Sequence, residues 1–554
     1  MKTRGYQDSL LRELIVELFS GGGGSGIGAS QATGRPVDIA VNHDPDAIAM
    51  HIVNHPFTKH YQEDVFAVDP EEATGGRPVG LLWASPDCKH FSKAKGGTPV
   101  DKKIRGLSWV ILRWAMSSVA PRCLFMENVE EIQTWGPLIE VDGKKRPDPA
   151  RAGETFKGFI AMLTDGISKD HPAFLEACEF LKISPDSVQA NKLIKGLGYK
   201  AEWKILKACD YGVPTIRKRF YMIARRDGLP IVWAKATHGK SEGLKPYRTA
   251  ADCVNWSIPC PSIFGRKKEL AVNTQRRIAR GLDKFVIKNP QPFIMQMNFE
   301  NAPQDVSDPL STITAVNKHF LVETKVQPYI MCNNTNNTQH SMEEPVPTIT
   351  TGNRNFLMAA NIVHYYGGAD HASSPNSPLP TVTTLPRHYL VENHICVLRN
   401  NMDCRSMRDP ISTITAHAGH EAIISTYIQK LDSTQDLKNW PKVRKLLNEY
   451  AGYNIAEDEI LIIEIDGVQH FIADIGMRML KAEELKRAQG FPEDYIINIE
   501  PYIGKKYSEA KQIARLGNAV CPPVAEALIR ANCADMAYKK PLKTVKELQT
   551  AMCG

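Results

Sequence analysis

The sequence predicts an α/β fold built on a parallel sheet, and three apolar runs that end in glycine or polar residues support this prediction. The first run, residues 14–19 (LIVELF), passes into the glycine-rich segment 20–28 (SGGGGSGIG). The second, residues 37–41 (VDIAV), ends at NHDPD, and the third, residues 79–83 (VGLLW), ends in the loop ASPDCKHFS. Buried parallel strands are continuous apolar runs, and α/β enzymes bind ligands beyond the carboxyl ends of such strands. We therefore expect the chemistry at one edge of this sheet.

Length and composition are those of a globular protein with two or three domains. The 554 residues are 43% hydrophobic and 23% charged, which excludes a disordered or fibrous chain. The net charge of +7 is a mild lean toward polyanions that decides nothing without clustering. The 12 cysteines show no CxxC spacing, so we expect neither a zinc site or other metal nor a disulfide scaffold. Without a secretory signal or a run of about 18 apolar residues, the chain is expected to be cytoplasmic.

The glycine-rich segment predicts a ligand-binding turn at the start of a helix. Glycines let the backbone approach a ligand closely, and the amino end of the following helix points toward it. An acidic residue after the second strand of such a unit commonly holds ribose hydroxyls, which makes Asp44 a candidate, with N-capping of the next helix as the alternative. Asp64 falls where a third strand would end.

Cys88, in the loop after the run 79–83, is the candidate nucleophile. The neighbouring Lys89 and His90 favour its thiolate, while Asp87 opposes it, and a semi-buried structural cysteine is the alternative. A further apolar strand at residues 123–126 delivers Glu127 to the same edge of the sheet, where an ordinary strand-end carboxylate is the alternative. The sequence thus predicts a thiol and a carboxyl group near one cleft.

Two more segments complete the pattern. Arg217 and Arg219, in YGVPTIRKR, are two residues apart in an extended segment, so their side chains fall on the same face. Near the end of the chain, residues 516–523 (LGNAVCPP) open an apolar helix.

The order of these motifs resembles that of the DNA cytosine-5 methyltransferases: FSGGGG, PDCKHFS, MENV, YGVPTIRKR and LGNAVCPP follow one another, with the helix-like stretch 479–492 before the last. The resemblance covers roughly residues 11–240 and 475–535. It implies a Rossmann-like domain that binds S-adenosylmethionine and whose last helix arrives after an inserted target-recognition domain. It also implies cofactor contacts from the matched residues Phe19, Gly21, Gly23, Asp44, Asp64, Asn518 and Val520.

The resemblance also implies a mechanism. Cys88 would attack C6 of cytosine, and Glu127 would donate a proton toward N3 as charge develops on the ring. Arg217 and Arg219 would orient the base O2, the backbone around the extruded nucleotide, or Glu127 itself. Because C5 is inaccessible inside a duplex, the base must flip into the pocket.

The chain departs from the family pattern at several positions. Asp87 and Lys89 flank the nucleophile where Pro and Gln are usual, and Thr215 stands in place of a Gln. Glu17 replaces a more usual Asp in the first strand, and His43 and Asp44 stand near the usual Glu after the second. None of these changes removes a group that the chemistry requires.

The residues after the nucleophile predict a lid that closes over DNA. The basic residues of this segment flank a glycine pair at 96–97 that would serve as a hinge; they are Lys93, Lys95, Lys102, Lys103 and Arg105. A solvated surface loop is the alternative.

The middle of the chain contains an internal repeat, which starts at Pro309 (PLSTIT), Pro345 (PVPTIT), Pro378 (PLPTVT) and Pro410 (PISTIT), spaced 36, 33 and 32 residues apart. We expect a β-rich array over about 292–425. Its basic residues Lys318, Arg354 and Arg387 are expected to face DNA, with a structural scaffold as the alternative.

The sequence therefore predicts a catalytic domain in two parts, residues 1–245 with an insertion at 136–196 and residues 475–554, around a target-recognition domain at 246–474. The predicted function is methylation of C5 of cytosine in double-stranded DNA, by a monomer within a restriction-modification system whose nuclease the sequence does not identify. The alternatives are an RNA cytosine-5 methyltransferase, a catalytically decayed DNA-binding protein, or an enzyme that transfers a group other than methyl.

Overall fold

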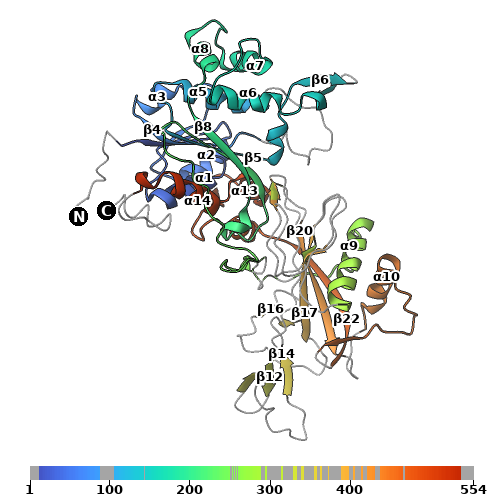
Figure 1. Cartoon of the computed structure of the whole chain (residues 1–554). Helices are drawn as coiled ribbons and strands as arrows, with labels where there is room; N and C mark the ends of the chain where they lie inside the picture. The colour runs from blue at the N-terminus through green and yellow to red at the C-terminus, as the bar shows by residue number, and fades with distance from the viewer. Residues whose placement is uncertain are drawn as a thin grey trace, which may run out of the picture. The chain divides into compact units, whose positions relative to one another are not determined.

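The computed structural model describes residues 12–87, 105–141, 144–249, most of 252–288, isolated strands between 294 and 430, and residues 437–465 and 468–537 (Figure 1). The chain divides into two compact units: the first contains residues 1–213, 217–246 and 489–554, and the second contains residues 214–216 and 247–488. Within the described ranges, no helix is long and apolar enough to span a bilayer.

The first unit is built on a seven-stranded sheet in the order β3-β2-β1-β4-β5-β9-β8. The first five strands in this order are parallel, β9 is antiparallel to β5, and β8 is antiparallel to β9. The strands are β1 (Leu14–Leu18), β2 (Ile39–Val41), β3 (Lys59–Tyr61), β4 (Val79–Ala84), β5 (Cys123–Asn128), β8 (Lys200–Lys207) and β9 (Lys218–Arg225). The predicted α/β class is confirmed, and the apolar runs at 14–19, 37–41, 79–83 and 123–126 form its central strands.

Helices cover both faces of this sheet (Figure 1). On one face, Val16, Leu82 and Met126 pack in a core with α5 (Val110–Met116), α6 (Glu154–Leu163), α7 (Pro172–Leu181) and α8 (Val188–Lys195). On the other, Ile15 and Phe125 pack in a core with α1 (Gly24–Thr33) and α14 (Pro522–Asn532). Because side chains alternate along a strand, Glu17 and Glu127 fall on the α1 and α14 face.

Shorter elements complete the first unit. They are α2 (Pro45–Asn54), α3 (Pro70–Thr74), η2 (Gly106–Trp109), η3 (Glu130–Thr134), η5 (Ala208–Tyr211), α12 (Glu500–Ile503), α13 (Glu509–Asn518) and η8 (Ala534–Met536). The expected insertion at 136–196 contains the antiparallel hairpin of β6 (Leu138–Val141) and β7 (Lys144–Pro147), then η4 (Pro149–Arg151) and α6 to α8. Trp135, before the hairpin, is buried against Trp109 with ring centroids 4.6 Å apart.

The end of the chain returns to pack directly on α1. A Cβ atom on Gly24 would lie 2.0 Å from the carbonyl oxygen of Val520, so only glycine permits this approach. The glycine-rich segment therefore serves chain packing as well as any ligand.

The second unit contains an eight-stranded sheet and two smaller ones. The large sheet comprises β10 (Ile294–Met295), β15 (Ile362–His364), β16 (Ala372–Ser373), β17 (His388–Val397), β18 (Cys404–Arg405), β20 (Glu421–Lys430), β21 (Ile463–Ile465) and β22 (Val468–Met479). The small sheets pair β12 (Tyr329–Cys332) with β13 (Thr338–Ser341) and β14 (Asn355–Met358), and β11 (Ile313–Ala315) with β19 (Thr413–Thr415). Its helical elements are α9 (Val272–Leu282), η7 (Asp283–Ile287), α10 (Trp440–Ala451) and α11 (Ala482–Ala488).

The internal repeat leaves a trace in this topology. Strands β11 and β19 come from the first and fourth repeats, and they pair in parallel with Ile313 opposite Thr413. The corresponding segments of the two middle repeats, 345–350 and 378–383, lie outside the described residues.

The boundary of the second unit differs from the expected one. Residues 475–488, which we expected in the C-terminal return, belong to the second unit. The reason is that β22 runs to Met479 along β20, and Arg478 then pairs with Glu484 of α11 at 2.9 Å.

Candidate active site

Glu127 and Arg219 form an ion pair at the carboxyl edge of the first unit's parallel strands. Glu127 is the fifth residue of β5, and Arg219 is the second residue of the neighbouring β9. The Arg219 Nε atom lies 3.4 Å from Glu127 Oε1, and both side chains are almost buried. Of the three tasks expected for the arginines, contact with Glu127 is present here for Arg219.

Arg217 performs a different task from Arg219. Its Nη1 donates to the carbonyl oxygen of Gly517 in α13 at 3.0 Å. Burial and the charge of Arg219 lower the pKa of Arg217 from its ordinary value. The two arginines thus connect the carboxyl edge to two partners, Glu127 and the returning chain end.

The loop that carries Cys88 begins beside Glu127. Asn128, the next residue of β5, donates from Nδ2 to the carbonyl oxygen of Pro86 at 3.1 Å. The indole of Trp83 donates to Ser85 Oγ at 3.0 Å. These bonds fix Ser85 and Pro86, the first two residues after β4, and Pro86 is two residues before Cys88 in the sequence.

Several predicted residues lie outside the described part of the chain. They are Cys88 and the predicted DNA contacts Lys93, Lys95, Lys318, Arg354 and Arg387. Arg105, which we expected on the DNA-facing lid, is described and is buried just before η2. Its charge faces Glu176, and burial lowers the pKa of Arg105 to about 10. The lid expectation is therefore wrong at Arg105, which belongs to the core.

The glycine turn has the properties of a ligand site. Phe19, Gly21 and Gly23 all have positive φ angles, of 58°, 53° and 77°, so the backbone turns sharply between β1 and α1. Gly23 is the N-cap of α1 and supplies no side chain to its first amide groups. Ser20 Oγ is buried and has no hydrogen-bond partner within the described residues. A helix amino end without a capping side chain at Gly23 and a buried hydroxyl fit a polar ligand.

Asp44 and Asp64 stabilise local backbone. Asp44 Oδ1 accepts from the amides of Asp46 at 2.9 Å and Ala47 at 3.3 Å, and Oδ2 pairs with Arg515 of α13. The structure thus contains the alternative expected for Asp44, the N-cap of α2. The exposed Asp64 accepts from the amide of Phe66 at 2.9 Å. A ribose contact from either carboxylate stays a prediction.

The returning segment lies along the turn, as the other predicted cofactor residues require. A Cβ atom on Gly22 would lie 3.0 Å from the Arg515 carbonyl oxygen, and Val520 contacts Gly24. Asn518 ends α13 with an exposed side chain, and Val520 is buried.

A cluster of the buried Glu17, His51 and His55 and the half-buried His60 was not predicted from the sequence, in which Glu17 stood out only as a departure from the family pattern. His51 and His55 are four residues apart, so they lie on one face of α2; this spacing was the available signal. Within the described part of the chain, no group of three or more His, Cys, Asp or Glu is arranged to hold a metal ion.

Comparisons with known proteins agree with this geometry. Residues 14–135 and 185–533 match the family described as C-5 cytosine-specific DNA methylase. The gap in the match, 136–184, falls inside the insertion that carries the β6–β7 hairpin, α6 and α7. The family match thus covers most of both parts of the sequence that carry the motifs.

Individual relatives are distant. The type II methyltransferase M.AquIA of Picosynechococcus is 24% identical over 267 residues, which are 45% of this chain and 90% of that protein. M.SacI of Streptomyces achromogenes is 25% identical over 249 residues, 41% of this chain and 52% of that protein. Among solved structures, the S. pombe Dnmt2 methyltransferase aligns with a TM-score of 0.41 and 13% identity, covering 95% of this chain and 100% of that chain. From the match over most of its length and the order of its motifs, this chain belongs to the C-5 cytosine-specific DNA methylase family.

Proposed function

We propose that this protein transfers a methyl group from S-adenosylmethionine to C5 of cytosine in duplex DNA, through a covalent bond between Cys88 and C6 of the base. The observation that carries the proposal is the Glu127–Arg219 pair, which lies next to the anchor of the Cys88 loop. An acid, a cation and a thiol loop at one edge of a parallel sheet are the groups that this chemistry needs.

Glu127 activates the ring together with Cys88. Cytosine C5 is too weak a nucleophile to take a methyl group unaided, so the Cys88 thiolate first adds to C6. The electron pair moves into the ring, and Glu127 donates a proton toward N3 while Arg219 holds the carboxyl group in place. The C5 atom of the adduct then carries the electron pair that forms the new bond to the methyl carbon, while the bond of that carbon to the cofactor sulfur would break and leave its electron pair on the sulfur.

The glycine turn is the proposed cofactor site. S-adenosylmethionine would supply an electrophilic methyl group there. Ser20 and the amino end of α1 are suited to its polar groups, and Val520 closes the turn from the returning segment. Once C5 is methylated, a base, for which we propose water, removes the C5 proton, and the electron pair of that bond expels the Cys88 thiolate. The proton at N3 returns to Glu127, which restores the ring.

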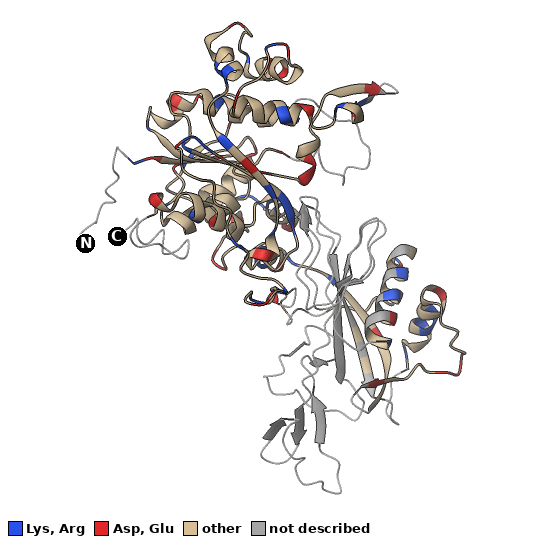
Figure 2. Cartoon of the chain, in the orientation of Figure 1, with Lys and Arg blue, Asp and Glu red and all other residues tan. Residues whose placement is uncertain are grey.

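We propose that the second unit reads the DNA target. Figure 2 marks Lys and Arg residues on α9 and α10, and Arg276, Arg280, Lys442 and Lys445 are exposed. Such residues suit contacts to phosphates. Lys318, Arg354 and Arg387 of the repeat, and Lys93 and Lys95 after the nucleophile, are the further contacts proposed.

The remaining parts of the proposal concern the setting. We propose that the protein acts as a monomer in the cytosol, within a restriction-modification system. Both curated relatives described above are named as type II methyltransferases.

One experiment tests the function. The full chain is incubated with tritiated S-adenosylmethionine and either duplex DNA or transfer RNA, and the label in each polymer is counted. We expect label in DNA only, loss of that label in Cys88→Ala, and full label in Cys178→Ala, which removes a buried thiol of α7 instead. Label in RNA alone, or none in either polymer, would overturn the proposal that duplex DNA is the substrate.

A second measurement tests the covalent step. Duplex DNA with 5-fluorocytosine at the target has no C5 proton to lose, so the adduct should be trapped as a complex that survives denaturing electrophoresis. If Cys88→Ala still transfers tritium to DNA in the first experiment, the covalent mechanism is refuted, but the proposed methyltransferase activity is not.

A further inference from the structure

Three titratable side chains, Glu17, His51 and His60, form a hydrogen-bonded row beneath the glycine turn, which we call the proton chain. Glu17, only 1% exposed, uses Oε1 to accept hydrogen bonds from Ser25 Oγ and from the Gly26 amide at 3.1 Å. Its Oε2 lies 3.0 Å from His51 Nε2. Glu17 therefore joins the first turn of α1 to a histidine of α2.

The proton chain continues to the edge of the sheet. His51 Nδ1 lies 2.8 Å from Nε2 of His60, which is partly exposed on the edge strand β3. This arrangement connects the buried carboxyl group of Glu17, through two imidazoles, with solvent.

A branch of the cluster supports the turn itself. His55 stacks on His51 with ring centroids 4.2 Å apart. A Cβ atom on Gly23 would lie 3.0 Å from His55 Nε2 and 2.4 Å from Tyr495 Oη, and Tyr495 Oη donates to the Gly22 carbonyl at 2.7 Å. Together with Glu17, these side chains contact the turn at Gly22, Gly23, Ser25 and Gly26.

The hydrogen bonds within the chain depend on one another. A neutral imidazole has one N–H, so an ionised Glu17 that accepts from His51 Nε2 leaves His51 Nδ1 to accept from His60. A protonated Glu17 would donate to His51 Nε2 instead, and the N–H of His51 would move to Nδ1. The protonation state of Glu17 and the tautomer of His51 therefore change together.

The groups that face Glu17 come from α2, β3 and the segment after α11: His51 and His55, His60, and Tyr495. Burial lowers the pKa of His51 to about 3 and of His60 to about 4, so both are neutral at neutral pH. Burial raises the pKa of Glu17 to about 7, against hydrogen bonds from Ser25 and Gly26 that favour the ionised form. Glu17 is thus the member of the chain that changes charge near neutrality.

We propose that Glu17, His51 and His55 are positioning residues that hold the glycine turn in its cofactor-binding shape, and that the proton on this chain sets how tightly S-adenosylmethionine binds. The inference rests on the proposed assignment of the turn as the cofactor site. Ionised Glu17 is the stronger acceptor for Ser25 and Gly26, because hydrogen bonds to charged groups are stronger than neutral ones. Affinity should therefore rise as Glu17 loses its proton.

The test is calorimetric titration of the full chain with S-adenosylmethionine, without DNA, at pH values from 6 to 8.5. The amino group of the ligand also titrates near pH 8, so the informative quantity is the difference between the native profile and that of Glu17→Gln. We expect Glu17→Gln to bind about tenfold more weakly at pH 8, with the gap closing toward pH 6. Turnover at saturating cofactor should stay close to native. Parallel profiles would overturn the proposal.

Two controls separate positioning from mere loss of structure. Asn54→Ala removes a buried polar side chain of α2 that bonds Ile496, so it should weaken binding equally at every pH. At the partly exposed end of the chain, His60→Ala should shift the midpoint of the pH profile, and His60→Gln, which keeps an N–H donor, should restore it. If both His60 variants match the native profile, the proposed link between His60 and the proton on Glu17 is refuted, even where Glu17→Gln fails to fold.

The outcomes distinguish this inference from the proposed function. If native protein binds no S-adenosylmethionine at any pH, the cofactor assignment fails and the inference with it. If it binds the cofactor and labels DNA but Glu17→Gln follows the native profile, the inference alone fails.

Discussion

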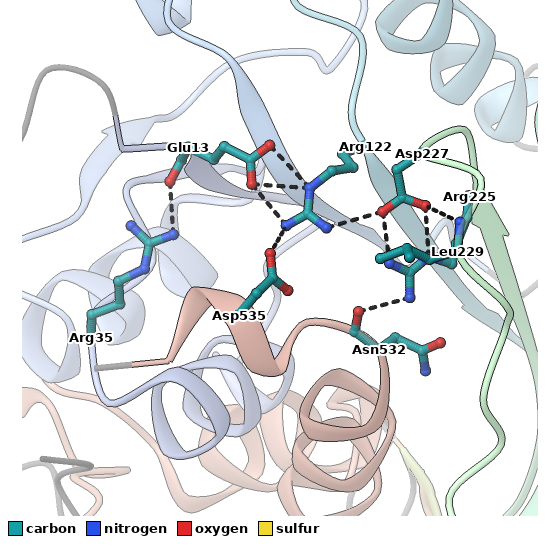
Figure 3. A network of polar contacts seen from close by, with 8 residues as sticks. All are labelled: Glu13, Arg35, Arg122, Arg225, Asp227, Leu229, Asn532 and Asp535. Atoms are coloured by element: carbon teal, nitrogen blue, oxygen red, sulfur yellow. Dashed lines mark hydrogen bonds and ion pairs between the residues drawn. The ribbon is translucent and has the colours of Figure 1, made fainter. Parts of the chain in front are cut away.

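The two edges of the central sheet use the same kinds of residue in opposite ways. At the carboxyl edge, Arg219 reaches Glu127 through one contact of 3.4 Å. At the amino edge, Arg122 contacts Glu13 at 2.8 Å, Asp227 at 3.0 Å and Asp535 at 2.6 Å (Figure 3). Arg122 is surrounded by three protein carboxylates, whereas Arg219 contacts one carboxylate and donates from Nη1 to the carbonyl oxygen of Lys218 at 2.8 Å.

The contrast holds within single strands. Arg122 immediately precedes β5, which ends with Glu127 and Asn128, and β9 begins with Lys218 and Arg219 and ends with Arg225. Arg225 pairs with Asp227 at 2.7 Å and donates to the carbonyl oxygen of Asn532, the last residue of α14, at 2.8 Å (Figure 3). The amino edge therefore fastens the segments before β1 and after α14 to the sheet, and the proposed chemistry lies at the opposite, carboxyl edge. Substitutions at the two edges should separate stability from reaction rate.

The largest effect is expected from Glu127→Gln at the carboxyl edge. Removal of the acid should lower the rate of methyl transfer about 10²- to 10⁴-fold, the range that general acid catalysis contributes. The melting temperature should change little, because the amide keeps the size of the side chain and can still face Arg219. Single-turnover transfer of labelled methyl groups measures the rate. A native rate would remove Glu127 from the mechanism.

At the amino edge, Arg122→Ala should show the reverse pattern. The change leaves the carboxylates of Glu13, Asp227 and Asp535 without this cation. It should lower the free energy of unfolding by about 3 kcal/mol and the melting temperature by several degrees. Methyl transfer per folded molecule should stay close to native. Differential scanning calorimetry, with Arg122→Lys as a partial rescue, checks the stability. A stable but inactive Arg122→Ala would contradict the division between the edges.

Much of this contrast was predictable from sequence at the carboxyl edge. The apolar runs and the order of the motifs predicted the strands, the family and the edge of the sheet at which Glu127 lies. These features are local: strand periodicity and strand ends can be read within ten residues. The family prediction is confirmed by the match over residues 14–135 and 185–533.

The amino edge and the Glu17 cluster were not predictable in the same way. Arg122 and Asp535 are 413 residues apart, and Asp44 and Arg515 are 471 apart, so no local pattern connects them. The sequence also could not decide whether Asp44 caps a helix or contacts a ligand, because an aspartate before a helix suits both roles. His51 becomes informative only when β1 and α2 are seen to bring it to Glu17.

The pH dependence of stability gives a smaller effect at the amino edge. Hydrogen bonds from Arg225 and Arg122 lower the pKa of Asp227 well below its ordinary value. A carboxyl group with a depressed pKa in the folded state stabilises the fold above its unfolded pKa, near 4, and loses that contribution as the pH falls through its folded pKa. Asp227→Asn should therefore cost about 2 kcal/mol at pH 7 and progressively less below pH 4. Urea unfolding at several pH values measures the difference, and a constant difference would contradict the assignment.

The smallest effect is expected at an exposed ion pair of the carboxyl edge. Lys511 of α13 contacts Asp46 of α2 at 2.8 Å, but the Lys511 side chain is half exposed. Exposed pairs contribute less than about 1 kcal/mol and are screened by salt, so Lys511→Ala should barely change the melting temperature.

The neighbouring Arg515 also pairs with Asp44, and its carbonyl oxygen faces Gly22. Arg515→Ala should therefore weaken S-adenosylmethionine binding severalfold more than Lys511→Ala, as measured by calorimetric titration. Equal effects of the two substitutions would mean that general charge, and not the contact between α13 and the glycine turn, holds the returning chain in place.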